Sequence, residues 1–281
     1  MKKITPAFIA FLLINLYAFC QTTSKIVLVK NTKFEILNTT TGTVSMEMMG
    51  QSMETKSEAS DANSYEVKEA LSSGYTLSET LTKVKLNVSG GMAPPINFDS
   101  EKKENLDSEV GKTFKDKLNK PSDVQIDLTG KKTEKKDESA NEQEAMANTM
   151  QSIISAGVDK GIEAAFMVIP ANKKAGDSWF DSSNNDGIRV VNTHTLTEMK
   201  GSNDVVVTKT IANAIKSINI QGAEIGLNVN SKVISTASVE TASGLIKEKI
   251  TIVDGAGTMD AGGQTIPMTF KTTTNTTVKS L

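Results

Sequence analysis

Three aspartates lie close to the only tryptophan of the chain and could supply the carboxyl pair of a glycosidase. Asp177, Asp181 and Asp186 flank Trp179, and such an enzyme uses one carboxyl group as acid and a second as base or nucleophile. Carboxylates this close in sequence more often bond the backbone of a turn. We therefore predict a structural role, in which the Gly-Asp pair begins a strand and the tryptophan packs in the core. The motif consists of Gly176, Asp177, Ser178 and Trp179.

His194 is the only histidine and lies between Thr193 and Thr195 in a strand-like segment. A Ser-His-Asp triad is assembled in space, so sequence spacing leaves a hydrolase open. The G-x-S-x-G motif is absent, and the single cysteine, Cys20, excludes a zinc site built from several cysteines. We predict no catalytic residues. A secreted hydrolase that uses carboxylates or Ser-His194 is the alternative.

Methionines gather near one turn, where Met46, Met48, Met49 and Met53 could offer soft thioether ligands to Cu(I). Alternation along a strand places Met46 and Met48 on one side and Met49 on the other, which favours core or cavity lining. The Asp254–Asp260 segment lacks the residue order of a calcium-binding EF-hand loop, and two hairpin turns account for it. We predict no metal and no cofactor.

The charge balance and the scarcity of aromatic residues argue against a nucleic-acid partner. There are 31 basic and 33 acidic residues, and Arg189 is the only arginine. Nucleic-acid recognition relies on clustered lysine and arginine, and binders of single strands present aromatic platforms. Aromatic residues make up 5% of the chain. We therefore predict no nucleic-acid partner.

Residues 1–20 have the order of an export signal. Lys2 and Lys3 precede an apolar run that ends at Phe19 and is too short for a membrane helix. We predict cleavage after Cys20, and export to the periplasm or beyond. Lipid attachment to Cys20 is disfavoured, because a small residue is expected before a lipidated cysteine. No later apolar run reaches the ~20 residues of a membrane helix, so we predict no transmembrane span in the mature chain.

The predicted domains are an N-terminal β block (residues 21–132), a charged loop with an amphipathic helix (133–169) and a C-terminal β block (170–281), which together could form one domain. In the first block, Lys25–Lys30 is a β-like apolar run. Turns are predicted at Gly50-Gln51-Ser52 in this block and at Lys200–Asn203 in the C-terminal block. A helix is predicted near residues 100–119, because apolar residues recur there at every fourth position.

A second predicted helix begins near Ser139 and carries an apolar stripe as far as Phe166. Gly157 and Gly161 interrupt it and predict a bend or a break. The stripe residues predicted to face a ligand are Met146, Met150, Ile154, Val158, Ile162 and Phe166.

The C-terminal block alternates as strands do. One face carries Ile246, Ile250 and Ile252, and the opposite face carries Lys247, Lys249 and Thr251. The Thr272–Thr277 tract fits an exposed edge strand. The predicted fold is mainly antiparallel β (β-rich α+β). Either a curved sheet or two β lobes carries two central helices, with a half-barrel-like layout similar to that of envelope lipid carriers.

The segments Ile96–Ser100, Gly176–Trp179 and Thr193–Leu196 together resemble a family of uncharacterised, signal-bearing bacterial proteins with a domain of unknown function. The resemblance covers about residues 25–279. It implies export and the order β block, helical stretch, β block, and it brings no catalytic residues.

These features predict an exported, non-enzymatic cell-envelope protein. The surplus of 12 methionines suits adaptable binding, so the expected partner is a lipid or other apolar ligand, or an envelope protein. Besides the hydrolase, the alternative is a structural or adhesion-like β module that docks along Thr272–Thr277.

Overall fold

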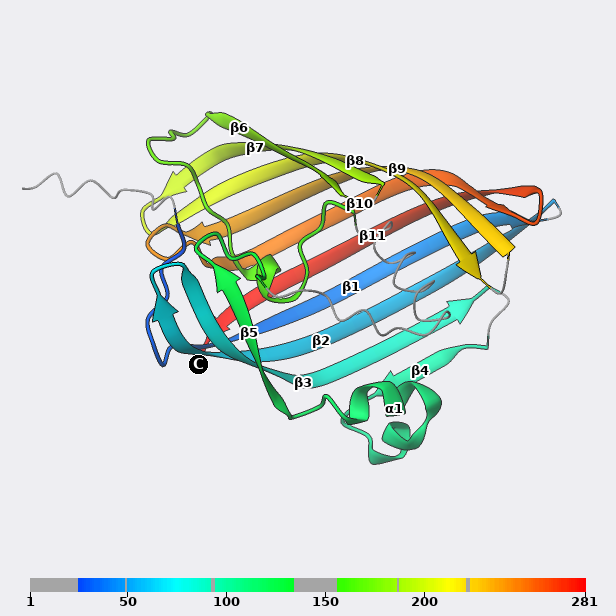
Figure 1. Cartoon of the computed structure of the whole chain (residues 1–281), viewed down its shortest axis with the longest axis horizontal. Helices are drawn as coiled ribbons and strands as arrows, with labels where there is room; N and C mark the ends of the chain where they lie inside the picture. The colour runs from blue at the N-terminus through cyan, green and yellow to red at the C-terminus, as the bar shows by residue number, and fades with distance from the viewer. Residues whose placement is uncertain (1–24, 49, 92–93, 134–155, 186, 221–222) are drawn as a thin grey trace, which may run out of the picture.

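The computed structural model describes residues 25–48, 50–91, 94–133, 156–185, 187–220 and 223–281. In these residues, one antiparallel sheet of 11 strands forms the body of the protein (Figure 1). The strand order is β4-β3-β2-β1-β11-β10-β9-β8-β7-β6, and β5 also pairs with β3. The prediction of a mainly antiparallel β fold is confirmed, and the strands form one sheet.

The strands are long, and neighbours in sequence mostly pair with each other. They are β1 (Lys33–Met48), β2 (Gln51–Leu71), β3 (Gly74–Gly90), β4 (Ile96–Asp99), β5 (Pro121–Asp127), β6 (Ser178–Asn185), β7 (Ile188–Lys200), β8 (Asn203–Ile220), β9 (Ala223–Glu240), β10 (Ile246–Ala261) and β11 (Gln264–Ser280).

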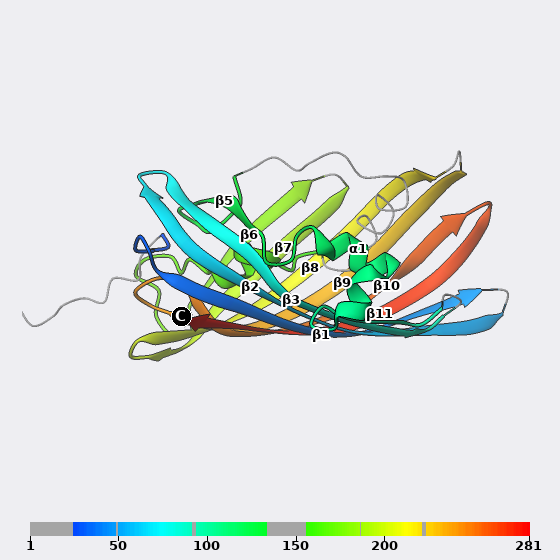
Figure 2. The same ribbon diagram turned by 90° about the horizontal axis from the view of Figure 1, so that it is seen from below.

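The sheet curls into a trough, with β1 and β11 along its floor (Figure 2). Strand twist accumulates across a wide sheet, and register shifts add local bends. Such shifts occur in β2 between Ala62 and Asn63, and in β7 between Leu196 and Glu198. We call the concave side the inner face and the convex side the outer face.

Glycine turns join the long strands. Gly50 and Gly201 have φ values of 74° and 65°, a left-handed conformation that glycine adopts without steric cost. They confirm the turns predicted at Gly50 and at Lys200–Asn203. The sequence predicts two hairpin turns for Asp254–Asp260 and the Ala-Gly-Gly that follows. The turn at Gly262–Gly263 is confirmed, and the earlier one is wrong, because Asp254–Asp260 continue β10.

The Thr272–Thr277 tract lies in the middle of the sheet. It belongs to β11, which pairs with β1 on one side and with β10 on the other. The predicted edge strand is therefore wrong. Threonine is β-branched and suits a central strand as well as an edge, and its hydroxyl finds a cross-strand partner here, since Thr274 and Thr40 are hydrogen-bonded at 2.9 Å.

The first predicted helix is shorter than expected. It consists of a 3-10 helix, η2 (Lys103–Asp107), followed by α1 (Glu109–Lys115). The Ser108 hydroxyl accepts a hydrogen bond from the Gly111 N–H at 3.0 Å, and this N-cap starts a new helix. The continuous four-turn helix is therefore wrong.

The second predicted helix does not reach Phe166 as an α-helix. Residues 139–155 lie outside the described residues, and 156–166 contain only a 3-10 helix, η3 (Gly161–Ala165). Gly157 and Gly161 have φ values of 79° and 55°, which a right-handed helix cannot include. The predicted break at the two glycines is confirmed.

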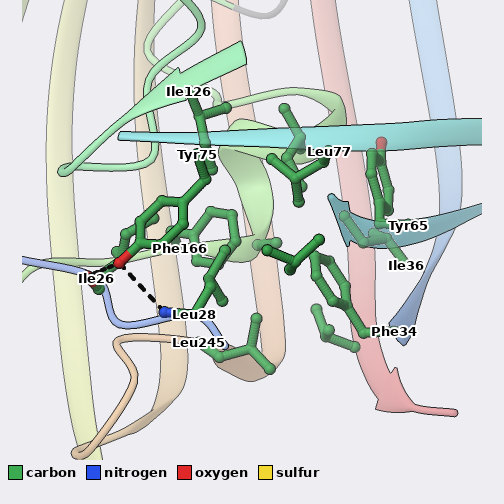
Figure 3. Close-up of a cluster of buried hydrophobic side chains, with 14 of the residues drawn as sticks. Ile26, Leu28, Phe34, Ile36, Tyr65, Tyr75, Leu77, Ile126, Phe166 and Leu245 are labelled. Atoms are coloured by element: carbon green, nitrogen blue, oxygen red, sulfur yellow. Dashed lines mark hydrogen bonds between the residues drawn. The ribbon is translucent and has the colours of Figure 1, made fainter. Parts of the chain in front are cut away.

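One end of the trough is filled by the chain's own apolar residues (Figure 3). Phe34 stacks on Tyr65 with ring centroids 5.3 Å apart, and Phe166 meets Phe34 edge-on at 6.1 Å. Tyr75 donates its hydroxyl proton to the Ile26 carbonyl at 2.9 Å. We call this packed cluster the plug. Its principal members are Ile26, Leu28, Phe34, Tyr65, Ile162 and Phe166.

The Lys25–Lys30 run is extended but is not a strand of the sheet. Its backbone bonds to two separate loops, with the Ile26 N–H donating to Leu128 and the Val27 N–H to Ser243, both at 2.9 Å. The β-like assignment of this run is therefore wrong. The alternating side chains enter the plug instead of pairing with a strand.

Along part of β8, β9 and β10, isoleucines lie on the outer face and polar residues on the inner face. Ile211, Ile234 and Ile250 point outward and are 57%, 50% and 51% exposed. Lys249 and Thr251 point inward and are 6% and 3% exposed. The predicted opposite faces of β10 are confirmed for residues 249–252, where the polar face lies inside the trough. The prediction is wrong for Ile246, which is 0% exposed because the register shifts between Ile246 and Glu248.

Candidate functional site

The inner face of the trough has three zones that follow one another along the strands. The plug occupies one end. A band of hydroxyl, amide and imidazole side chains, the polar belt, crosses the middle. Its main row consists of Thr40, Thr274, Thr251, Ser235, Thr208 and His194, each opposite the next on the neighbouring strand. Apolar residues line the other end, which we call the methionine end.

Belt side chains satisfy one another by hydrogen bonds. Ser235 and Thr251 are joined at 3.0 Å, and in the next row Thr276 donates to Asn38 at 2.9 Å. Asn38 in turn donates to Asp61 at 3.0 Å. Burial raises the pKa of Asp61, and the amide donors only partly oppose that rise. Because the groups are paired, the belt keeps a polar floor without a large desolvation cost.

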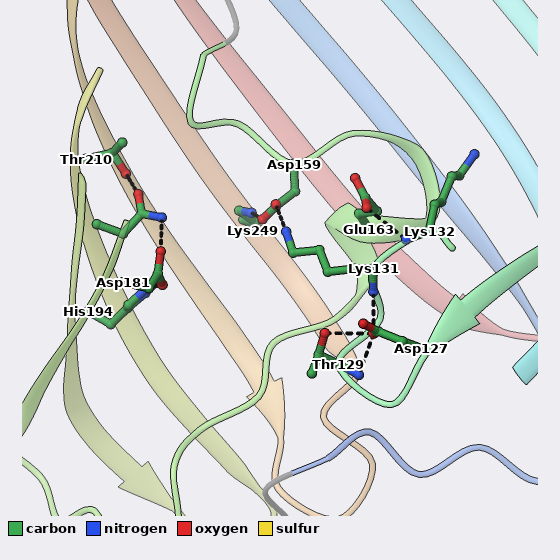
Figure 4. A network of polar contacts seen from close by, with 11 residues as sticks. Asp127, Thr129, Lys131, Lys132, Asp159, Glu163, Asp181, His194, Thr210 and Lys249 are labelled. Carbon is green, nitrogen blue, oxygen red and sulfur yellow. Dashed lines mark hydrogen bonds and ion pairs between the residues drawn. The ribbon is translucent and has the colours of Figure 1, made fainter. Parts of the chain in front are cut away.

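A lysine is buried in the floor beside the belt. The Lys249 side chain is 7% exposed, and its Nζ lies 3.4 Å from Asp159 Oδ2. The other oxygen of Asp159 lies 2.7 Å from Lys131 Nζ (Figure 4). Burial alone would raise the pKa of Asp159, but the two ammonium groups outweigh it and hold that pKa below its usual range. This ion-pair cluster joins the sheet to two loops.

The loop that carries Lys131 is itself held by Asp127 (Figure 4). One carboxylate oxygen of Asp127 accepts hydrogen bonds from the backbone N–H groups of Thr129 and Lys131 at 2.7 and 3.0 Å. Burial would raise the pKa of Asp127, but these bonds lower it overall. A single carboxylate thus orders the turn and places the Lys131 ammonium group over the trough.

His194 is held at both ring nitrogens by side chains. Its Nε2 lies 2.6 Å from Asp181 Oδ2 (Figure 4). Its Nδ1 lies 2.9 Å from Thr208 Oγ1. The residue types match a hydrolytic triad. Thr208, however, is only 8% exposed, so its hydroxyl is not open to a bound molecule as a nucleophile would need to be. The arrangement orients the imidazole at the β6–β7 side of the belt.

The Gly-Asp-Ser-Trp motif lies at the start of β6, where Trp179 is only partly buried beside the core. Gly176 has a φ of 95°, and the Asp177 carboxylate accepts a hydrogen bond from the Lys174 N–H at 2.9 Å. Ser178 is the first residue of β6. Trp179 stacks on His194 with ring centroids 5.1 Å apart. The motif thus orders the start of β6, and through Trp179 it also holds the ring of His194 in place.

Met46 is the centre of a methionine row at the far end. Its cross-strand neighbours are Met53 of β2 and Met268 of β11, and Met259 packs against the same apolar cluster. Local spacing could not reveal Met268, which comes from a distant strand. Unbranched thioethers adapt to the shape of what they contact. Thioether sulfurs are also the ligands at this end that could hold a soft metal ion. Among the described residues, no three His, Cys, Asp or Glu side chains converge as a metal site.

The methionine end also depends on a glycine. Gly255 lies opposite Phe270 on the inner face, and a Cβ atom added to Gly255 would lie 2.1 Å from the Phe270 ring. The ring therefore lies flat across the floor, in the space that a side chain would take. A cross-strand aromatic over a strand glycine is a known way to cover exposed backbone.

Three of the six residues predicted to face a ligand are described. Val158 packs against the apolar cluster of the methionine end. Ile162 and Phe166 are 0% and 5% exposed within the plug. The other three, Met146, Met150 and Ile154, lie outside the described residues. The inner-face residues that the sequence did not single out, such as Met259, Met268 and Lys249, come from the C-terminal strands.

Comparisons with known proteins give little further guidance. No family model and no curated protein matches the chain. Among solved structures, an outer membrane channel from Pseudomonas putida F1 is 6% identical with a TM-score of 0.29, covering 91% of this chain and 98% of its own. Pseudomonas aeruginosa OccK7 (OpdD) is 8% identical with a TM-score of 0.22, covering 89% and 100%. Scores this low support neither a shared fold nor a shared function. No helix in the described residues is long and apolar enough to cross a membrane.

Proposed function

We propose that this protein is an exported, non-enzymatic protein of the cell envelope that binds an apolar ligand, such as a lipid acyl chain, at the methionine end of its trough. The observation that carries this proposal is the inner face of β1, β10 and β11. Val44, Met46 and Met259 are only partly buried there, beside a floor of fully buried apolar residues.

The chemistry of the two neighbouring zones supports this choice. Burying apolar surface of a ligand gains about 25 cal/mol per Å², and methionine side chains adjust to different chains at low cost. The polar belt, with Lys249 and Asp159, lies next along the strands. A ligand with an apolar tail and a polar head matches this order of zones.

The export part of the proposal rests on the sequence. Residues 1–20 have the order of a signal, and the Gly176–Trp179 segment resembles a signal-bearing bacterial family. We propose that the chain shares the architecture and the compartment of that family. A hydrolase receives less support, because the hydroxyl beside His194 belongs to Thr208, which is buried and closed to a substrate.

A fluorescent long-chain fatty acid titrated into the purified, exported protein tests the proposal. The decisive variant is Val44→Asp, which places a carboxylate on the inner face between Thr55 and Phe270. Thr43→Asp is its matched control, because Thr43 lies next along the same strand on the outer face, opposite Lys56 and Lys271.

We expect Val44→Asp to raise the dissociation constant more than about tenfold, since a buried charge opposes an apolar ligand. Thr43→Asp should bind as the unmodified protein does. Thermal unfolding of both variants establishes that they are folded. Absence of binding by the unmodified protein, or equal binding by both variants, would remove the trough as the apolar site.

A further inference from the structure

The two edges of the sheet differ in how they are closed. On one side, β5 begins with Pro121 and is covered by the following loop: the Asp127 N–H donates to Lys131 at 2.8 Å and the Thr133 N–H donates to Gln125 at 3.0 Å. The neighbouring β4 has only 4 residues. A proline, a covering loop and short length are the means by which proteins protect an edge from further pairing.

Strand β6 forms the opposite edge and is open. It has 8 residues and pairs only with β7. Leu196 of β7 donates to the Asp177 carbonyl, while the next carbonyl, that of Ser178, points away and accepts from Lys173 Nζ at 2.9 Å. Alternation along an antiparallel ladder then directs the backbone groups of Phe180, Ser182 and Asn184 outward. No described segment pairs with them.

The open edge also lacks the side chains that discourage pairing. Strand β6 has no lysine, arginine or proline. Its one charge, Asp181, points to the inner face and is already bonded within the chain, to Asn192 at 2.7 Å and to His194 at 2.6 Å. Phe180 points to the outer face and is 72% exposed. The outer side of this edge strand is uncharged and carries an exposed aromatic ring, which favours pairing with another strand.

We propose that β6 is the interface for a second copy of this chain, which adds its own β6 antiparallel to the first. A two-fold axis pairs identical strands in this way. The Ser178 carbonyl is already bonded to Lys173. The outward-facing backbone groups that remain belong to Phe180, Ser182 and Asn184, so the pairing is centred on Ser182. Each Ser182 then faces its counterpart, and Phe180 faces Asn184 of the second copy. This register sets Asp181 opposite Ser183, whereas centring on Asp181 would oppose two carboxylates, which is destabilising.

Cysteine cross-linking tests the register. Cys20 lies in the predicted signal, so the exported protein presents only the introduced thiol. In a hydrogen-bonded antiparallel pair the Cα atoms lie about 5.5 Å apart, within the range of a disulfide. We expect Ser182→Cys to give a covalent dimer on mild oxidation. Ser178→Cys is the control, since it lies on the same strand and outer face but beyond the paired centre, and it should stay monomeric.

Sedimentation equilibrium of the unmodified protein and of Ser182→Pro tests the association itself. Proline on an edge strand removes only an N–H that faces outward, so the fold should keep its melting temperature. We expect the unmodified protein to form a dimer, and we expect Ser182→Pro to raise the dissociation constant of that dimer more than about tenfold. A monomer at ~100 µM, or equal cross-linking from Ser178→Cys and Ser182→Cys, overturns the proposal. Neither measurement depends on a ligand in the trough.

Discussion

The plug and the methionine end share strands β1 and β11 of one sheet, yet they are packed differently. In the plug, Phe34 and Tyr65 stack under Phe166, and all three are at most 5% exposed. At the methionine end, Met46 and Met259 are partly buried. The difference lies in what covers the strands. Chain segments from outside the sheet fill the plug, whereas much of the far end rests on unbranched side chains and on the Gly255–Phe270 pair.

The two ends of the trough are therefore expected to have different roles, with the plug contributing mainly to stability and the methionine end mainly to binding. Rigid aromatic packing fixes a structure because it leaves no room to rearrange. Methionine packing tolerates change with little loss. We therefore expect substitutions in the plug to lower the free energy of unfolding strongly, and substitutions at the methionine end to act less on stability and more on ligand affinity.

The largest effect is expected from Phe166→Ala in the plug. Removing a buried phenylalanine costs about 3–5 kcal/mol through lost burial and the cavity left behind. The control is Phe180→Ala on the outer face, where the ring is 72% exposed and the expected change is within about 0.5 kcal/mol. Urea unfolding followed by circular dichroism measures both. Similar losses from the two variants would mean that the plug does not stabilise the sheet.

Gly255→Ala tests the methionine end and should cost about 1–3 kcal/mol, because the new methyl group meets the buried Phe270 ring. Gly226→Ala is the matched strand variant. Its Cβ would lie 3.7 Å from the nearest atom, in Asp260, so we expect no loss and a gain of up to about 1 kcal/mol from the reduced freedom of the unfolded chain. Thermal unfolding distinguishes the two, and an equal response would contradict the close approach of ring and backbone.

The ion-pair cluster next to the polar belt should respond to pH. The pKa of Asp159 is lowered in the fold, since Lys249 and Lys131 outweigh its burial. Its contribution is therefore present above the unfolded pKa of about 3.9 and is lost as the pH falls through the lower folded value. We expect Asp159→Asn to cost about 1–2 kcal/mol at pH 7, reduced from a fully buried pair because Asp159 is 36% exposed.

The same comparison made at a pH below the lowered folded pKa of Asp159 provides the internal control for Asp159→Asn. There the unmodified carboxyl group is largely protonated, so the two proteins should approach equal stability. A loss of the same size at both pH values would assign the effect to packing of the side chain and not to its charge.

Much of the sheet could be predicted from the sequence, because alternation and turn residues are local signals. Gly50 and the Lys200–Asn203 segment marked turns correctly. Alternation also separated Ile250 from Lys249. Alternation alone could not predict which face is buried. Apolar residues usually face the interior, but here Lys249 does so because it is paired with Asp159 from a distant loop.

The site was harder to predict, because it depends on contacts between distant strands. The row of Met46, Met53 and Met268 exists only because β11 returns to pair with β1. For the same reason the Thr272–Thr277 tract, which is polar enough for an edge, lies in the centre of the sheet. The predicted helix lengths were wrong for a local reason. Ser108 caps a new helix, and the positive φ of Gly157 is incompatible with the helix that apolar spacing alone would continue through it.

The smallest effect is expected at a polar defect beside the plug. Asp204 is 1% exposed, and its Oδ2 has no hydrogen-bond partner among the described residues. The adjoining cavity, of about 10 Å³, has room for about one water molecule. Burial raises the pKa of Asp204, so the ionised carboxylate opposes folding above the folded pKa, and the penalty vanishes below the unfolded value of about 3.9.

Asp204→Asn should therefore stabilise the protein by about 1 kcal/mol at pH 7, since it removes a buried charge that is incompletely bonded. Below pH 4 the gain should disappear, which is opposite in sign to the effect of Asp159→Asn. Thermal unfolding across this pH range measures both. If Asp204→Asn destabilised the protein at pH 7, the carboxylate would have a partner in solution, such as a bound water, and the region beside the plug would be as well satisfied as the polar belt.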